Sequence, residues 1–238
     1  MKKTGTIFLL CIVLVGVFAI LTYLEPTTSS EKKGESKKTA SDSDYKYTVI
    51  VDAGHGGIDP GKIGVNGVYE MDINLSIAYK LSDILEEKGI KAVMTRKDDN
   101  GLYNDEDSNK KMQDMENRVR IINESGAKAV ISIHQNSFTK EAAHGAQVFY
   151  HDLSPKGELL AGCIQNELYK IDDTNSRKIN SDTDYYILRK SNPVAVIVEC
   201  GFLSNNKEAG LLSDGAYQER IAKAIADGVE EYVRQEDE

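Results

Sequence analysis

The stretch VIVDAGHGG, residues 49–57, decides the fold of this 238-residue chain. Its apolar start is typical of a buried parallel strand, and the glycines around His55 allow a sharp turn where the strand ends. Two more apolar runs stop in the same way: AVISIHQN (129–136) leads to His134, and VAVIVECGF (194–202) leads to Glu199. Because the carboxyl ends of parallel strands form the edge where α/β folds build their sites, these three side chains are expected to lie together.

Strand and helix patterns alternate from Tyr47 onward, which predicts an α/β fold. We expect a mostly parallel sheet with helices on both faces. The expected strands are Tyr47–Asp52, Lys91–Thr95, Ala129–His134, Gln147–Tyr150, Tyr186–Leu188 and Val194–Glu199. The expected helices are Glu70–Lys88, Asp114–Glu124, Pro155–Lys170 and Tyr217–Val233. The polar stretch 97–113 reads as a long solvated loop.

Composition excludes some functions and leaves others open. A net charge of -9 argues against a basic nucleic-acid-binding face. The cysteines are widely separated, so Cys163 and Cys200 are expected to be buried thiols, with a bridge between them as the alternative. His144 and His151 lie in polar segments and are expected at the surface.

The N-terminus predicts export. Lys2 and Lys3 precede an apolar run of membrane length that ends at Leu24, and no small-residue cleavage site follows it. We therefore expect a signal anchor over 1–24, with a cleaved signal peptide as the alternative. Residues 25–45 are polar and predict a flexible linker, and 46–238 form the expected catalytic domain. The domain should face outside the cytoplasm, membrane-anchored, or be secreted if cleavage occurs.

The side chains at the sheet edge predict a catalytic metal. Two imidazoles and one carboxylate are the three-ligand set of a catalytic zinc, which keeps one position open for water. A second carboxylate is then available as the base, and Glu70 opens the helical pattern EMDINLSIAYKLSDILEEKG. Asp59 and Asp72 compete with Glu70 for its place. The glycine-rich loop lacks both GxGxxG and GK[ST], so nucleotide binding is a weak alternative.

Several motifs together resemble one family, the zinc-dependent N-acetylmuramoyl-L-alanine amidases of the family-3 type. In order, the motifs are DAGHGGIDPGKIG (52–64), Glu70, TRKDD (95–99), ENRVRIIN (116–123), SIHQNS (132–137) and YYILRKSNPVAVIVECGFLSN (185–205). The resemblance implies that His55, Glu70 and His134 are the zinc ligands. It also implies that Glu199 is the catalytic glutamate. We also expect Asn136 to hold substrate or to orient His134.

The resemblance implies an α/β fold with a mixed, mostly parallel twisted sheet of about six strands and helices on both faces. It also implies hydrolysis of the amide between N-acetylmuramic acid and L-alanine in peptidoglycan. The membrane segment, short tether and lack of a separate wall-binding module are also similar to cortex amidases of endospore-forming bacteria. That likeness implies spore cortex as substrate, formation of muramic-δ-lactam, and an activating protein partner. The alternatives are another zinc peptidase or deacetylase of the cell wall, or a tethered wall-binding module with structural zinc. A structural site would have four protein ligands, whereas an enzyme would have three and an open position.

Overall fold

The computed structural model describes residues 45–237. The predicted anchor (1–24) lies outside the described residues, as does the predicted linker (25–45) apart from Tyr45. Within 45–237, no helix is both long and apolar enough to span a membrane.

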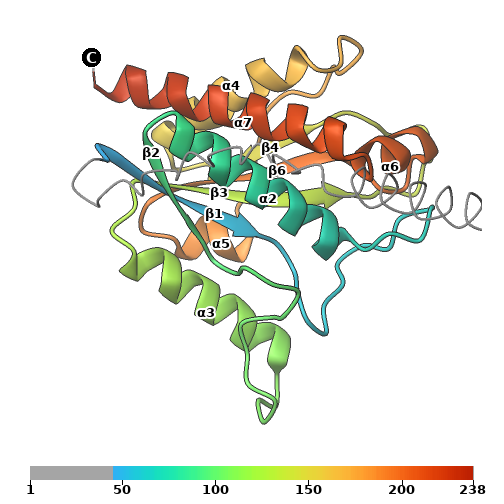
Figure 1. Ribbon diagram of the computed structural model, residues 1–238, viewed down its shortest axis with the longest axis horizontal. Helices are drawn as coiled ribbons and strands as arrows, with labels where there is room; N and C mark the ends of the chain where they lie inside the picture. Colours follow the sequence, from blue (N-terminus) through green and yellow to red (C-terminus); the bar gives the residue numbers. More distant parts are fainter. Residues whose placement is uncertain (1–44, 238) are drawn as a thin grey trace, which may run out of the picture. The chain divides into compact units, whose positions relative to one another are not determined.

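One mixed sheet forms the centre of the fold (Figure 1). Its strands are β1 (Tyr47–Ala53), β2 (Ile90–Met94), β3 (Ala129–Asn136), β4 (Gln147–Tyr150), β5 (Asn180–Ser181) and β6 (Val194–Phe202), in the spatial order β2-β1-β3-β6-β4-β5. The four strands from β2 to β6 run parallel, β4 is antiparallel to β6, and β5 is parallel to β4. This confirms the predicted mixed, mostly parallel sheet of six strands.

Helices cover both faces of the sheet, as predicted (Figure 1). One face carries α2 (Glu70–Glu87), α4 (Pro155–Tyr169) and α7 (Gly215–Glu236), and the other carries α3 (Lys110–Glu124) and the short α5 (Tyr186–Lys190). The short helix α6 (Asn206–Leu212) follows β6. Helices α4 and α7 approach closely at Gly228, where an added Cβ would lie 2.5 Å from the Cα of Ile164.

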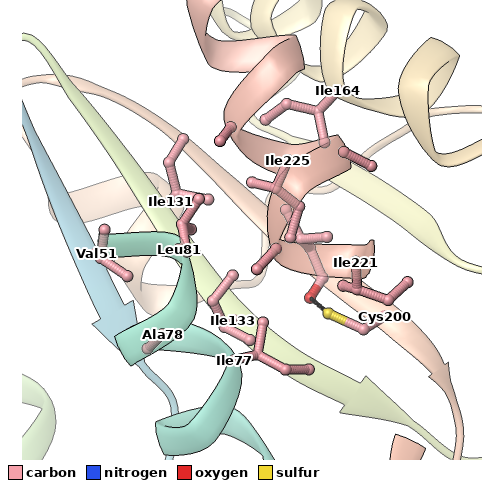
Figure 2. Packing of buried hydrophobic residues seen from close by; sticks show 14 of the residues in the cluster. Val51, Ile77, Ala78, Leu81, Ile131, Ile133, Ile164, Cys200, Ile221 and Ile225 are labelled. Carbon is pink, nitrogen blue, oxygen red and sulfur yellow. Dashed lines mark hydrogen bonds between the residues drawn. The ribbon is translucent and has the colours of Figure 1, made fainter. Parts of the chain in front are cut away.

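Alternation along the strands divides the core in two. Val51 of β1 and Ile131 of β3 pack with α2, α4 and α7 in the larger cluster (Figure 2). Ile50 and Val130, their neighbours along the chain, point to the opposite face and pack with α3 and α5. All four side chains are fully buried, and burial of each such side chain stabilises the fold by roughly 1.5–3 kcal/mol. The ends of β1 and β3 are therefore held firmly from both faces.

The observed elements differ from the expected ones in four places. The predicted strand Tyr186–Leu188 is wrong: the segment is α5, and a short apolar run does not distinguish a buried helical turn from a strand. The sixth strand is instead β5, whose two exposed polar residues carry no apolar pattern. The predicted loop 97–113 ends early because Asn109 caps α3 through the backbone N–H of Met112. Helix α6 was not predicted.

Candidate metal centre

His55 stands on a tight loop directly after β1. It is the only non-glycine residue with a positive φ in the described part of the chain, at 63°. Gly56 and Gly57 follow with φ angles of 138° and 61°, which glycine adopts without the steric cost of a Cβ. The left-handed backbone costs a histidine on the order of 1–2 kcal/mol, so other contacts must hold this conformation in place.

Two buried arginines supply these contacts. Arg96 donates to the carbonyls of Ala53 and Gly54 from Nε and Nη2, at 2.9 and 3.1 Å. Arg118, 1% exposed, donates to the carbonyl of Ala53 at 2.6 Å and also to that of His55. These bonds fix the backbone of the loop at and before His55.

Arg118 is itself fixed by two carboxylates. Its Nη1 lies 2.8 Å from Asp52 Oδ1, and its Nε lies 2.6 Å from Asp114 Oδ2. Ser132 and Thr95 donate to the Asp52 carboxylate at 2.6 Å each. Burial acts to raise the pKa of Asp52, but Arg118 and the two hydroxyls outweigh it and lower the pKa to about 2. Asp52 therefore stays ionised and ties the loop side of the site to β3.

His134 reaches the site from a regular strand. It lies inside β3 and pairs in register with Glu199 of β6, so the two side chains point to the same face of the sheet. This is the face covered by α3 and α5, because Val130 and Ile197 pack there at even spacing. Both strands continue past these residues, to Asn136 and Phe202, so the expectation that the strands stop at His134 and Glu199 is wrong.

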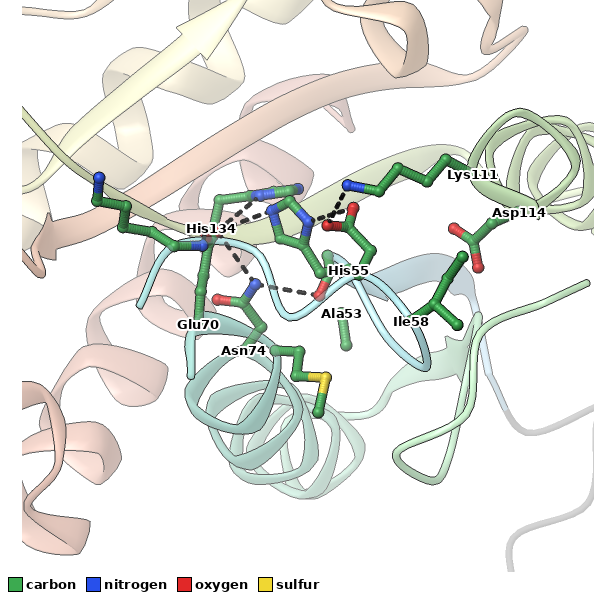
Figure 3. Close-up of polar contacts among 12 residues, drawn as sticks. Ala53, His55, Ile58, Glu70, Asn74, Lys111, Asp114 and His134 are labelled. Carbon is green, nitrogen blue, oxygen red and sulfur yellow. Dashed lines mark hydrogen bonds and ion pairs between the residues drawn. The ribbon is translucent and has the colours of Figure 1, made fainter. Parts of the chain in front are cut away.

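Glu70 brings the two histidines together. It is the first residue of α2 and is 4% exposed. Its Oε1 lies 3.2 Å from Nε2 of His55 and 3.1 Å from Nδ1 of His134 (Figure 3). The backbone N–H of Gln135 donates to the same oxygen at 3.0 Å, while that of Lys62 donates to Oε2 at 2.8 Å. Burial acts to raise the pKa of Glu70, but the histidine contacts outweigh it and hold that pKa well below its usual range.

These three residues form the one potential metal-binding group among residues 45–237, with candidate ligand atoms all within 4.8 Å of one another. Two glycines make room for this convergence. A Cβ on Gly54 would lie 2.2 Å from the ring of His134, and one on Gly61 would lie 2.6 Å from Glu70 Oε2 and 2.7 Å from the ring of His55. Two imidazole nitrogens and a carboxylate oxygen, brought together where two glycines leave room, fit a divalent metal ion.

The Nδ1 side of the His55 ring contacts Asp59, which in turn pairs with Lys111. Its Nδ1 lies 2.9 Å from Asp59 Oδ2, and Lys111 Nζ lies 2.8 Å from Asp59 Oδ1. Burial acts to lower the pKa of His55, but Glu70 and then Asp59 outweigh it and raise the pKa to about 9. Burial likewise acts to raise the pKa of Asp59, but Lys111 and His55 lower it on balance.

Glu199 is the second carboxylate at the site. It is 7% exposed, and its Oε2 has no hydrogen-bond partner among the described residues. Burial is the main reason that its pKa is raised to about 7, while His134 acts to lower that pKa and Glu70 to raise it. A carboxylate with a free oxygen and a pKa near neutrality suits proton transfer.

A cavity of about 510 Å³ opens over the cluster. Residues from α3, from the segment around α5 and from the loops that contain Ile58 and Tyr103 form its walls, and Asn136 and Ser137 line it at the end of β3. The wall residues include Ile58, Tyr103, Met115, Tyr185, Tyr186 and Ile187. Asn136 is half-buried, and its side-chain oxygen accepts from the backbone N–H of Ser137 at 2.7 Å. Its position lets it contact a ligand in the cavity.

The other candidates lie away from the cluster. His144 is exposed, His151 is half-buried, and Asp72 is exposed on α2. Cys163 and Cys200 are buried free thiols, as predicted. Residue patterns did not identify Arg96, Lys111 or Arg118 as parts of the site. The motifs TRKDD and ENRVRIIN contain the two arginines, and those motifs were the available signal.

Comparisons with known proteins point to one family. A sequence model described as N-acetylmuramoyl-L-alanine amidase matches residues 49–231. The germination-specific N-acetylmuramoyl-L-alanine amidase of Bacillus subtilis is 35% identical over 187 residues, which are 77% of this chain and 78% of that protein.

Two solved structures share the fold at substantial identity. The CwlD amidase of Clostridioides difficile, solved in complex with the GerS lipoprotein, is 42% identical with a TM-score of 0.77, covering 79% of this chain and 98% of that one. The catalytic domain of CwlV from Bacillus (Paenibacillus) polymyxa var. colistinus is 30% identical with a TM-score of 0.70, again covering 79% and 98%. This chain therefore belongs to the N-acetylmuramoyl-L-alanine amidase family, whose members act on peptidoglycan.

Proposed function

We propose that this amidase is a zinc enzyme and that His55, Glu70 and His134 hold the ion. The observation that carries the proposal is the approach of Nε2 of His55 and Nδ1 of His134 to one oxygen of Glu70, at 3.2 and 3.1 Å. Three protein ligands leave a coordination position for water or substrate, as catalytic zinc sites do. The alternative, a wall-binding module with structural zinc, requires four protein ligands. The potential metal-binding group found within residues 45–237 contains three.

The bond broken is the amide between the lactyl group of N-acetylmuramic acid and L-alanine. The chemistry that a bound zinc ion supplies is Lewis acidity toward the carbonyl oxygen and toward water. Glu199 accepts a proton from the attacking water as the new C–O bond forms. It then returns that proton to the nitrogen of L-alanine as the C–N bond breaks, which regenerates the carboxylate. Asn136 contacts the substrate beside His134.

Replacing Glu199 tests the assignment of the base. Glu199→Gln keeps the shape of the side chain but cannot accept the proton. We expect zinc content to stay at the wild-type level and turnover on peptidoglycan to fall by about 10²–10⁴-fold. Unchanged turnover would remove Glu199 from the mechanism, and loss of zinc would make it a ligand instead.

The ligand set is tested by zinc content. His55→Ala, His134→Ala and Glu70→Ala should each lose zinc and activity together, because a three-ligand site binds poorly with two. His144→Ala is the matched control, since His144 is exposed and outside the cluster. Elemental analysis of the purified variants gives the result directly, and full zinc occupancy in any of the three would remove that residue from the ligand set.

We propose spore-cortex peptidoglycan as the natural substrate, where removing the peptide leaves the muramic acid from which muramic-δ-lactam is made. The support is the 35% identity to a germination-specific amidase, together with the 42% identity to a CwlD amidase. Deleting the gene in the producing organism should abolish muramic-δ-lactam in spores. Complementation should restore it with the wild-type gene but not with Glu199→Gln. Normal lactam content after deletion would refute the cortex assignment.

We also propose that residues 1–24 anchor the enzyme outside the cytoplasm and that a protein partner activates it. The partner proposal is supported by the related CwlD amidase, which was solved with a lipoprotein. Fractionation should recover the full-length chain with membranes, whereas a mature N-terminus after residue 20 would indicate a cleaved signal. Full activity of the purified chain with zinc alone would contradict the need for a partner.

A further inference from the structure

The ring of His55 lies between two carboxylates that differ in their surroundings. Glu70 faces Nε2 at 3.2 Å and also contacts His134. Asp59 faces Nδ1 at 2.9 Å on the opposite edge of the ring and lies outside the group of potential ligands. Of the three residues in that group, Asp59 contacts His55.

The Asp59 contact determines which nitrogen of His55 carries the proton. A neutral imidazole has one N–H and one lone pair. When Nδ1 donates its hydrogen to Asp59, the lone pair is on Nε2, which faces Glu70 and His134. A carboxylate in this place also fixes the angle of the ring and makes the ligating nitrogen more basic.

Lys111 holds Asp59 in that orientation. Its Nζ contacts Oδ1 at 2.8 Å, so each oxygen of the carboxylate has its own partner. Lys111 extends from the first turn of α3 toward His55 (Figure 3). Arg118 lies two turns further along the same helix and binds the backbone carbonyl of His55. Helix α3 thus holds the ring of His55 through Asp59 and its backbone through Arg118.

We propose that Asp59 is a positioning residue that presents Nε2 of His55 to the metal ion, and that Lys111 keeps the Asp59 carboxylate in place. The inference rests on the proposed function, since it requires that His55 binds zinc. It gives Asp59 no contact with the ion.

The test measures zinc affinity. The full-length chain, purified in detergent, is stripped of metal and titrated with zinc against a chromophoric chelator. Asp59→Ala should raise the dissociation constant by about 10–100-fold, as loss of such outer partners does. Asp59→Asn keeps an oxygen that can accept from Nδ1, so its loss should be smaller. Lys111→Met should give a weaker loss in the same direction.

The matched control is Asp105→Ala. Asp105 also pairs with a lysine of α3, Lys110 at 3.2 Å, but it is exposed and touches no histidine. Its zinc affinity should equal that of the wild type. Melting temperatures of the metal-free variants, measured in chelator, separate a folding defect from a binding defect. A general loss of structure would lower these temperatures for Asp59→Ala, whereas positioning leaves them near the wild-type value.

The outcomes distinguish a failure of the positioning role of Asp59 from a failure of the zinc assignment. If the wild type binds no zinc, or His55→Ala binds as tightly as the wild type, the zinc assignment fails. If the wild type binds zinc through His55 but Asp59→Ala and Asp59→Asn match its affinity, only the positioning role is overturned. Equal losses in Asp59→Ala and Asp105→Ala would also overturn it, because a nonspecific effect of surface charge would then explain both.

Discussion

His55 and His134 reach the same oxygen of Glu70 from two different kinds of backbone. His134 sits inside β3 with ordinary strand geometry, and its direction follows from the alternation of the strand. His55 sits on a loop at a φ of 63° and depends on contacts with other parts of the chain. Arg118 and Asp59 are the main ones, at its backbone and at its ring.

The difference shows where the cost of building the site lies. A strand places a histidine through packing that the fold needs in any case, since Ile133, next to His134 in β3, is fully buried. The loop is instead held in place by buried charged side chains. Burying a charge destabilises the folded state unless that charge is fully paired. Changes to the paired charges should therefore damage the His55 side of the site more than the His134 side.

The largest expected effect is at Arg118. Arg118→Met removes the partner of Asp52 and Asp114 and leaves both carboxylates without their cation. Breaking a buried pair in this way costs about 3–5 kcal/mol, measurable by urea unfolding. Amide hydrogen exchange should accelerate more at Gly56 than at Gln135, and equal acceleration would contradict the comparison. Arg120→Met, on the exposed side of the same helix, is the control and should change stability little.

The elements that the sequence predicted correctly are those with a repeated pattern. Helix α2 follows its apolar spacing, and β1, β3 and β6 follow their apolar runs. The failures were at short elements with little pattern. Two exposed polar residues make β5, and a short apolar run makes α5. Such segments take their structure from neighbours in space, which local sequence does not encode.

For the site, sequence identified the side chains that converge but not those that hold them. His55, His134 and Glu199 follow apolar runs, so strand topology brings them together. Arg118 reaches the loop from 63 residues away in sequence, and Lys111 reaches Asp59 from 52 residues away. Such contacts depend on how α3 packs against the sheet. The hydrophobic pattern of the sequence does not predict that packing.

On the His134 side, the sensitive position is Gly54. Its φ is ordinary, but a Cβ there would lie 2.2 Å from the ring of His134, so Gly54→Ala must displace that ring. We expect zinc affinity to fall by about 10–100-fold, a loss comparable to that of an outer partner. Gly162→Ala is the control, because nothing lies within 4 Å of its Cβ position in α4. That variant should keep wild-type affinity and gain up to about 1 kcal/mol of stability. Wild-type zinc affinity in Gly54→Ala would refute the steric account.

Asp52 joins the two sides, since it accepts hydrogen bonds from Arg118 and from Ser132 of β3. Its folded-state pKa of about 2 lies below the ordinary aspartate value of 3.8, so its contribution to stability is complete above about pH 4 and is lost as pH falls toward 2. The shift corresponds to about 2 kcal/mol. Urea unfolding between about pH 5 and pH 2 should show a shallower loss for Asp52→Asn than for the wild type. Parallel curves would mean that Asp52 does not contribute in this way.

The smallest expected effect is the sharpest test of the comparison, because it predicts opposite signs at the two histidines. At residue 55, glycine adopts the left-handed backbone freely while alanine is strained, so His55→Gly should be more stable than His55→Ala by about 1 kcal/mol or less. At residue 134, inside β3, glycine costs roughly 0.5–1 kcal/mol relative to alanine, so His134→Gly should be the less stable variant. All four variants lack a proposed ligand, so urea unfolding in chelator compares backbone effects without metal. The same sign at both positions would mean that the backbone of His55 is not strained, and the contrast between loop and strand would then rest on side-chain contacts alone.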